Sequence, residues 1–327
     1  MLKPFIICMT PVKNEAWILN AFLKVTSIWA DYIIIADQNS IDNSREIALQ
    51  FPKVILIENK SDKYNESSRQ ELLINRARQI KGDKILFALD ADEIFSANFI
   101  ETNDWHKILN SVPGDVFWFK WANIFSDKKH YWESKNHFPW VFHDDGNEPH
   151  KNYAKNMHSM RIPYPIHEKQ MYYVNDFKVL HLAYLSPKRT IAKLKFYQII
   201  DYQLNKRNSI VLSRSYQQPQ TKGLIYKLPK DWVYTQKVHL FDLFEEINLS
   251  EMNLWYYDNI TEIFEKEGIN KFLKINIWDK ELNYHLNCDD NRPLIRKIIH
   301  KYLNKTDKIS NNLIIKLIDK LLKKIID

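Results

Sequence analysis

The sequence contains very little glycine, five residues in 327, which is well below the usual ~7%. A backbone cradle for phosphate needs glycine, because only glycine lets the N–H groups approach the ligand closely. Neither of the common glycine-rich motifs, G-x-G-x-x-G and G-x-x-x-x-G-K-[ST], occurs in the chain. If the protein binds a nucleotide, we therefore expect side chains or a metal ion to hold its phosphates.

Cysteine and long apolar runs are also scarce. The two cysteines, Cys8 and Cys288, form no C-x-x-C pair, so the sequence indicates neither a disulfide framework nor a zinc site. No apolar run approaches ~18 residues, and the short apolar stretch at residues 1–10 is too soon followed by charged residues to be a secretory signal. We expect a cytoplasmic protein without a membrane span.

The sequence is rich enough in apolar residues, at 45%, to form a sizeable globular core, and its length suggests about two units. Its net charge of +7 lies entirely in residues 292–327, which hold ten basic and three acidic residues. A nucleic-acid groove would need basic residues spread along the body of the fold. We therefore expect no nucleic acid among the partners.

The first hundred residues alternate between short apolar runs and helical patterns. The runs that read as strands are residues 4–10, 32–36, 54–57 and 85–89, and the helical patterns between them are 15–29, 44–50 and 67–80. Continuous apolar strands joined by helices are typical of a parallel sheet covered on both faces. We predict an α/β fold with one mostly parallel sheet.

Three of the loops that would follow these strands are polar and acidic. They span residues 13–15, 37–42 and 90–93. In a parallel sheet, ligands bind beyond the carboxyl ends of the strands, and crossover connections bring these ends to one edge. We therefore expect a ligand site built from the three loops.

The last of these loops contains Asp90-Ala91-Asp92 after an apolar strand, ILFAL. Carboxylates two residues apart in an extended chain point to opposite faces, so only a turn beginning at Asp90 lets both reach one ligand. Such a pair suits Mg²⁺ or Mn²⁺, which bind one or two carboxylates together with phosphate oxygens and water. The alternative is that Asp92 or Glu93 caps a helix beginning near Phe95. The apolar strand before the pair and the polar loops beside it favour the metal site.

Taken together, these segments resemble the GT-A glycosyltransferases of the family 2 type over about residues 4–200. The matching residues are Pro11, Asn14 and Glu15 after the first strand, Asp37, Ser40 and Asp42 after the second, Asp90, Ala91 and Asp92 after the fourth, and Asn75, Arg76, Ala77 and Arg78 in the preceding helix. The resemblance implies a Rossmann-like, mostly parallel sheet with helices on both faces. It also implies a nucleotide-diphospho-sugar as the donor.

The resemblance further implies a place for several of these residues. They are Pro11 in the nucleotide-binding site, Glu15 and Asp37 near the base and ribose, Asp90 near the ribose or donor sugar, and Asp92 on the metal ion. One place has independent chemical support, because a carboxylate such as that of Asp37 can accept the imide N–H of uracil or thymine. This favours UDP or dTDP as the nucleotide.

Two arginines of the matching helix, Arg76 and Arg78, can each form a bidentate pair with a diphosphate. Positions two apart do not share a helix face, so at most one is expected to bind the donor, and a solvated face is the alternative for both. On the resemblance, we assign Arg76 to the nucleotide site.

A later segment resembles a subset of the same family, in which Ile-His-Glu precedes a strand that ends in His-x-x-Tyr. The matching residues are Ile166, His167 and Glu168, followed by His181 and Tyr184. Related GT-A folds recruit a histidine from this side, so the resemblance implies His181 as a further metal ligand. An imidazole ligand favours Mn²⁺ over Mg²⁺. A purely structural histidine is the alternative.

Glycosyl transfer with inversion needs a base for the acceptor hydroxyl and a cation that stabilises the departing diphosphate. We assign the base to Glu168, because it lies in a proline-rich loop downstream of the metal motif, where the acceptor side is expected. Asp144 and Asp145 are the competing candidates.

Tryptophans gather in the segment between the metal motif and this loop, at positions 118, 121, 132 and 140. Sugar rings stack on aromatic faces, so the segment is a candidate wall of the donor or acceptor pocket. For any single tryptophan, a place in the core is favoured.

The remainder of the chain carries no recognised motif. We divide the protein into a catalytic domain at residues 1–205, a helical subdomain at 206–305 and a basic amphipathic helix at 306–327. The last helix has a broad apolar face flanked by lysines. Three interpretations stay open for it: docking onto the protein itself, self-association, and peripheral contact with an anionic membrane at its inner face.

The function that the sequence predicts is a metal-dependent, inverting glycosyltransferase. It would use a nucleotide-sugar donor and a carbohydrate, lipid-linked or protein acceptor in the synthesis of a surface glycan, glycolipid or glycoprotein. The alternatives are a sugar-phosphate nucleotidyltransferase and a nucleotide-sugar-binding protein that keeps the GT-A shape without turnover.

Overall fold

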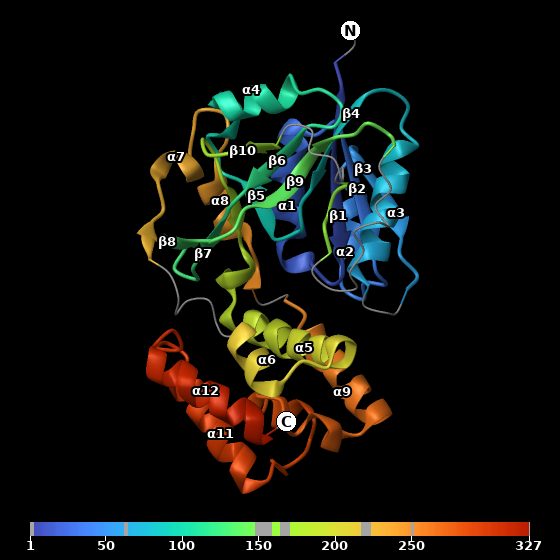
Figure 1. Ribbon diagram of the computed structural model, residues 1–327. Coiled ribbons are helices and arrows are strands. Elements are labelled where there is room, and N and C mark those ends of the chain that lie inside the picture. The colour runs from blue at the N-terminus through green and yellow to red at the C-terminus, as the bar shows by residue number, and fades with distance from the viewer. Residues whose placement is uncertain are drawn as a thin grey trace. The chain divides into compact units, whose positions relative to one another are not determined.

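The computed structural model describes residues 3–61, 65–147, 159–163, 171–216, 224–249 and 252–326. The chain forms two compact units (Figure 1). The sheet unit comprises Met1–Ser186 and Leu224–Asn253, and the helical unit comprises Pro187–Gly223 and Leu254–Asp327. This division differs from the predicted boundaries, because residues 187–205 belong to the helical unit and the chain later returns to the sheet unit.

The centre of the sheet unit is a seven-stranded sheet of order β10-β6-β9-β4-β1-β2-β3. Its strands are β1 (Phe5–Val12), β2 (Tyr32–Asp37), β3 (Val54–Glu58), β4 (Lys84–Ala88), β6 (Val116–Phe119), β9 (Phe138–His143) and β10 (Met171–Tyr173). The pairs of β1 with β2 and β4, of β2 with β3, and of β6 with β10 are parallel, whereas β9 is antiparallel to both of its neighbours. The predicted mostly parallel sheet and its first four strands are therefore confirmed.

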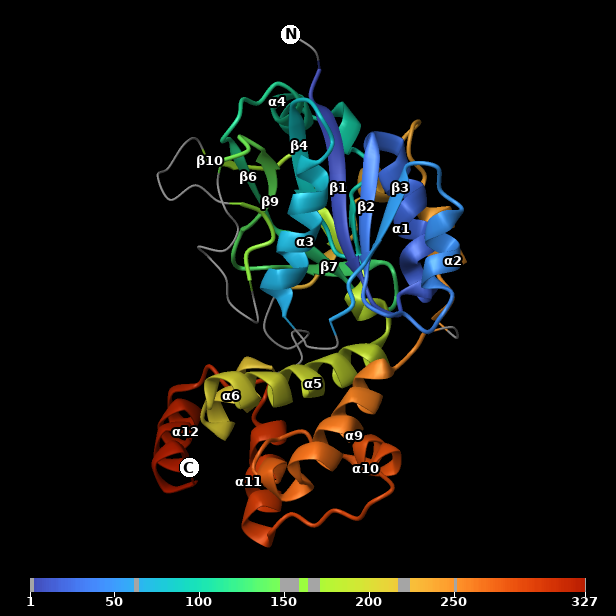
Figure 2. The ribbon, with the colours of Figure 1, turned by 90° about the vertical axis from the view of Figure 1, so that its right-hand side faces the viewer.

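Helices cover both faces of this sheet. Alternate residues of β1 point to opposite faces, as strand geometry requires. Cys8 packs with α1 (Ala16–Trp29) and α2 (Ser44–Leu49), whereas Ile7 and Met9 pack with α3 (Glu66–Arg78). Figure 2 shows α3 in front of the parallel strands.

The sheet unit also contains a five-stranded sheet of order β12-β8-β7-β11-β5. Its strand β5 begins directly after Asp92. Its strands are β5 (Glu93–Phe95), β7 (Trp121–Ile124), β8 (His130–Glu133), β11 (Val179–His181) and β12 (Tyr226–Lys227). The helices α4 (Asn103–Leu109), α7 (Lys230–Val233) and α8 (Leu240–Glu246) also belong to this unit. The alternative of a helix beginning near Phe95 is wrong, because Glu93–Phe95 is a strand that pairs with β11.

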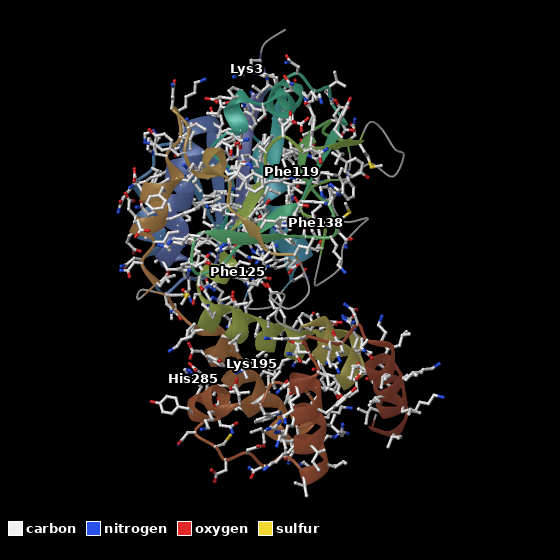
Figure 3. All side chains as sticks on the ribbon, turned by 90° about the vertical axis from the view of Figure 1, so that its left-hand side faces the viewer. Lys3, Phe119, Phe125, Phe138, Lys195 and His285 are labelled. Atoms are coloured by element: carbon white, nitrogen blue, oxygen red, sulfur yellow. The ribbon has the colours of Figure 1, made fainter. Side chains whose placement is uncertain are left out.

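The helical unit confirms the predicted helical C-terminal part. Its α-helices are α5 (Pro187–Asn205), α6 (Ser209–Ser215), α9 (Trp255–Glu267), α10 (Lys280–His285), α11 (Leu294–Lys305) and α12 (Leu313–Ile326). The buried Lys195 of α5, marked in Figure 3, donates to Asp279 at 2.5 Å and to the Tyr257 hydroxyl at 3.3 Å. Within the described residues, no helix is both long and apolar enough to span a bilayer.

Candidate functional site

The polar loops after β1 and β2 meet at the carboxyl edge of the sheet and are hydrogen-bonded to each other. The Asn14 N–H donates to Ser40 Oγ at 2.9 Å, and Asn14 Oδ1 accepts the Ile41 N–H at 2.8 Å. The Glu15 N–H donates to Ser44 Oγ at 2.9 Å. Asn14 has a φ of +54°, a left-handed conformation that asparagine tolerates better than most residues. Two of the three predicted loops therefore form one rigid edge.

Asp42 holds this edge together. One of its oxygens accepts the N–H of Ala16, the first residue of α1, at 3.0 Å. Its other oxygen accepts the N–H and the hydroxyl of Ser44, at 3.0 and 2.6 Å. A carboxylate at a helix N-terminus satisfies unpaired N–H groups and stabilises the helix dipole. Ser40 and Asp42, two of the residues that match the glycosyltransferase family, thus orient the loops after β1 and β2.

Asp37, the last residue of β2, offers a buried acceptor at the same edge. Its side chain is 1% exposed, and Oδ2 accepts from Arg45 Nη1 at 2.9 Å. Oδ1 is buried and makes no hydrogen bond within the described residues. Because a buried acceptor without a donor costs free energy, Oδ1 is suited to receive an N–H or O–H from a ligand. Pro11 lies beside this strand end, in register with Ala36.

Glu15 is the remaining acidic residue that the sequence assigns to the nucleotide side. It precedes α1 and its Oε2 accepts Trp17 Nε1–H at 2.8 Å. The structure therefore brings Pro11, Glu15 and Asp37 to one end of β1 and β2, as the sequence predicts.

The turn expected at Asp90 is present. The Glu93 N–H donates to the Asp90 carbonyl oxygen at 3.0 Å, and the Asp90 N–H donates to Glu93 Oε2 at 2.9 Å. The Asp92 carbonyl oxygen accepts the N–H of Leu182, directly after β11, at 2.7 Å. These bonds close the turn and tie it to the strand that carries His181.

His181 reaches Asp92 in a defined tautomer. Its Nδ1 is 2.7 Å from Asn123 Oδ1, and Asn123 Nδ2 is directed to the Trp132 carbonyl oxygen at 3.4 Å. An amide oxygen only accepts, so Nδ1 carries a hydrogen, and Nε2 is the nitrogen directed to Asp92, which carries the lone pair in the neutral imidazole. Nε2 lies 3.8 Å from Asp92 Oδ1, and the imidazole stacks on Trp121. Histidines that bind metals usually donate their other ring N–H in this way.

Asp92 and His181 have the chemistry and spacing to share a divalent cation. Bonds of about 2.0–2.2 Å to one ion place two donor atoms roughly 3 to 4.4 Å apart, depending on the angle between them. The 3.8 Å separation falls in that range. Within the described ranges, no group of three or more His, Cys, Asp or Glu side chains forms a metal site. A cation held by this pair would need water or phosphate oxygens as well, as Mg²⁺ usually does.

Arg161 is a central residue of the site to which the sequence reasoning assigned no role. Its Nη2 lies 2.6 Å from Asp90 Oδ2, and its Nη1 lies 2.5 Å from Glu93 Oε2. The guanidinium also lies over the rings of Trp121 and Trp140, with its central carbon 5.8 and 5.6 Å from the ring centres. Burial alone would lower the pKa of Arg161, but the charges of Asp90 and Glu93 outweigh it and raise that pKa.

Glu93 completes this arrangement, although the sequence suggested for it only a place in the polar loop or a helix cap. Its side chain is fully buried, and Oε1 accepts Trp121 Nε1–H at 2.7 Å. Burial raises the pKa of Glu93 to about 7, although the charge of Arg161 opposes the shift. The sequence did hold a signal for this arrangement: Glu93 is a third acidic residue close to Asp90 and Asp92. Neighbouring buried carboxylates need a cationic partner, so an arginine or lysine was to be expected beside them.

Arg76 is not brought to the site. A crossover helix begins near the carboxyl edge of the sheet and ends near the opposite edge, and Arg76 and Arg78 lie in the last turn of α3. Arg78 binds both oxygens of Asp144 there, with Nη2 to Oδ1 at 2.7 Å and Nε to Oδ2 at 3.0 Å. The Asp144 N–H donates to the carbonyl of Lys84, the first residue of β4. Asp144 is therefore also remote from Asp90 and does not suit the role of base.

The first turn of α3 contains a different arginine, Arg69, which the sequence reasoning overlooked. Its Nε is buried and makes no hydrogen bond within the described part of the chain. Because the start of α3 faces the carboxyl edge, the direction of the helix was the signal that favours Arg69 over Arg76. Glu168, assigned as the base, lies outside the described residues.

Comparisons with known proteins return distant likenesses. No protein-family model matches the chain, and no curated protein sequence matches it. Glucosyl-3-phosphoglycerate synthase from Mycobacterium tuberculosis, solved with Mn²⁺, UDP and glucosyl-3-phosphoglycerate, is 15% identical with a TM-score of 0.29, over 37% of this chain and 44% of that one. S. aureus TarS 1–349 is 11% identical with a TM-score of 0.40, over 94% of this chain and 91% of that one.

The chain matches less than half the length of the synthase, and both likenesses are too distant to assign an activity. The fold class follows from the chain's own sheet, which has the Rossmann-like, mostly parallel order that the GT-A resemblance implies. By its fold and its polar loops, this is an α/β protein with a candidate ligand site at the carboxyl edge of a parallel sheet.

Proposed function

We propose that the protein is a metal-dependent, inverting glycosyltransferase that moves a sugar from a UDP- or dTDP-type donor to a hydroxyl acceptor. The acceptor would be a carbohydrate, a lipid-linked glycan or a protein. The proposal is supported above all by the Asp90–Asp92 turn, where His181 Nε2 lies 3.8 Å from Asp92 Oδ1 at the edge that also carries Asp37.

Each part of a donor has a matching group at this edge. The buried Oδ1 of Asp37 suits the imide N–H of uracil or thymine. Asp90 has a second buried oxygen, Oδ1, without a hydrogen bond in the described residues, which suits a hydroxyl of the ribose or of the sugar. Asp92 and His181 would hold Mn²⁺ or Mg²⁺, which supplies positive charge to the leaving diphosphate.

The chain's own residues would organise the reaction around that charge. Arg161 keeps Asp90 and Glu93 in place, so that the turn presents Asp92 toward His181 without rearrangement. Glu168 remains the proposed base, which would take the proton from the acceptor hydroxyl as its oxygen attacks the anomeric carbon. Asp144 is bound to Arg78 at the opposite edge of the sheet, and Asp145 follows it directly in the chain, so Glu168 stays the proposed base over both.

The test is the thermal unfolding of the full-length protein with UDP, in the presence of Mn²⁺ and then of a chelator. A ligand that binds only the folded state stabilises it by about 2.7 kcal/mol at a hundredfold excess over Kd. We expect UDP to stabilise the protein with Mn²⁺ and not with the chelator. Asp92→Asn should abolish the effect, whereas Asp231→Asn, an exposed aspartate of the same unit, should retain it. Equal stabilisation of Asp92→Asn and wild type would refute the metal assignment.

The two alternative functions predict different assay results. A nucleotidyltransferase would release pyrophosphate from a nucleoside triphosphate and a sugar phosphate. A non-catalytic binding protein would show Mn²⁺-dependent UDP binding without donor hydrolysis or transfer to any acceptor. Release of UDP from a panel of nucleotide sugars would favour the transferase.

A further inference from the structure

The C-terminal helix α12 docks onto the helical unit with a narrow stripe of its surface. Ile315, Asp319 and Leu322 form this stripe, at the i, i+4 and i+7 spacing of one helix face. Leu322 packs against a small cluster that contains Ile210 and Leu303.

A buried ion pair anchors the stripe. Arg214 of α6 donates from Nε to Asp319 Oδ2 at 2.8 Å and from Nη2 to Oδ1 at 3.1 Å. The Tyr302 hydroxyl of α11 donates to Asp319 Oδ1 at 2.9 Å. The orientation of α12 about its own axis is therefore set by a charged residue, and Asp319 is the one acidic residue of this helix.

This orientation turns the broad apolar face of α12 outward. Its residues are between 60% and 78% exposed: Leu313, Ile314, Leu317, Leu321 and Ile325. With roughly 3.6 residues per turn, these positions share one side of the helix. Monomeric proteins rarely expose a contiguous apolar surface of this kind without a use for it.

Lysines border the exposed apolar face along one edge. They are Lys316, Lys320, Lys323 and Lys324, all of them exposed. Since Asp319 is buried, the exposed surface of α12 is apolar and cationic, with no acidic side chain. Helices that lie in a membrane interface have this composition, with lysine stems that reach past the apolar residues to the headgroups.

Charge argues against a second copy as the occupant of this surface. In a two-fold pair of antiparallel helices, the lysine edge of one helix would face the lysine edge of the other. No exposed acidic side chain of α12 is present to offset that repulsion. An anionic lipid surface complements both the lysines and the leucines at once.

We propose that the exposed face of α12, formed by these five apolar residues and four lysines, binds an anionic lipid surface while Asp319 keeps the helix attached to the protein. Two of the interpretations from the sequence then hold together: one side of α12 docks onto the protein, and the opposite side contacts the membrane. This proposal does not depend on the transfer reaction. It would place the protein where lipid-linked molecules are found.

The experiment is flotation of the full-length protein with phosphatidylcholine vesicles, with and without phosphatidylglycerol, at low and high salt. We expect binding only to the vesicles that contain phosphatidylglycerol, and a loss of binding at high salt, because exposed charges are screened. Each lysine near an anionic surface contributes about 1 kcal/mol, so Lys320→Gln with Lys324→Gln should weaken partitioning about 30-fold. Leu317→Gln should weaken it about tenfold.

Matched variants separate this surface from general charge and hydrophobicity. Lys266→Gln with Lys280→Gln removes two exposed lysines elsewhere in the helical unit, and Leu49→Gln removes an exposed leucine of the sheet unit. Both should float like the wild type. Equal binding to neutral and anionic vesicles, or no binding to either, overturns the proposal. So does a concentration-dependent dimer in analytical ultracentrifugation that Leu317→Gln converts to monomer, because the apolar face would then be an interface between copies.

Discussion

Removing the positive charge of Arg161 should destabilise the sheet unit strongly. Arg161→Met leaves the fully buried Glu93 carboxylate without its cation and leaves Asp90 Oδ2 without a donor. Breaking a buried ion pair by deleting one partner typically costs about 3–5 kcal/mol, because the remaining charge stays uncompensated. We expect a loss near the lower end, about 3 kcal/mol at neutral pH, since Glu93, whose pKa is already about 7, takes up a proton once its cation is removed and still accepts hydrogen bonds from Trp121 and from the Asp90 N–H.

Arg45→Met is the matched control for this prediction. Arg45 also pairs with a buried aspartate, at 2.9 Å from Asp37 Oδ2, but its own side chain is 36% exposed. Water reaches the Arg45 guanidinium and screens this pair, so we expect a smaller loss than at Arg161, although the Asp37 carboxylate is as buried as that of Glu93. The same substitution at two arginine–carboxylate pairs of one unit therefore isolates the effect of burial.

The assay is urea unfolding of the full-length variants, followed by tryptophan fluorescence. The double variant Arg161→Met with Glu93→Gln should lose less unfolding free energy than the sum of the losses in the two single variants. The reason is that the neutral amide at position 93 would leave no buried charge without a partner. If Arg161→Met costs less than about 1 kcal/mol, or if the two substitutions are additive, the ion pair does not stabilise the Asp90–Asp92 turn.

Three further predictions concern the hydrogen-bond partner of His181, the base and the helical unit. Asn123→Ala should weaken Mn²⁺ binding about 10- to 100-fold without unfolding the protein, because His181 loses the acceptor that fixes its tautomer; metal titration of the UDP-bound protein measures this, and unchanged affinity would contradict it. Glu168→Gln should leave donor binding unchanged and lower the transfer rate about 10²- to 10⁴-fold, as measured by UDP release; normal transfer would exclude Glu168 as the base. Burial, together with Arg292 and Arg296, lowers the pKa of His300 from 6.5 to about 4, so the unfolded chain binds the extra proton first and stability falls as the pH drops from 6.5 toward 4. Urea unfolding should show a loss of about 2 kcal/mol between pH 7 and pH 5 that His300→Gln lacks, and parallel pH profiles for the two proteins would refute it.

The sequence alone was sufficient to predict the alternating strands and helices of the first hundred residues and the edge of the sheet at which the polar loops meet. Hydrophobic periodicity is a local property, and right-handed crossovers then leave little freedom in where strand ends meet. The predicted meeting of Asp37 with the β1 loop, and of His181 with Asp92, agrees with the structure for this reason.

Tertiary structure decided which charged groups pair. Arg161 is separated from Glu93 and Asp90 by 68 and 71 residues, and no local pattern connects them. The sequence weighed Arg76 against Arg78 and did not consider Arg69, because a motif match carries no direction, whereas only the first turn of α3 lies near the carboxyl edge. The same limit applies to α12. Its periodicity showed an apolar face, but only the buried pair of Asp319 with Arg214 determines that this face points outward, because a desolvated charge must lie against its partner and the leucines then occupy the remaining side.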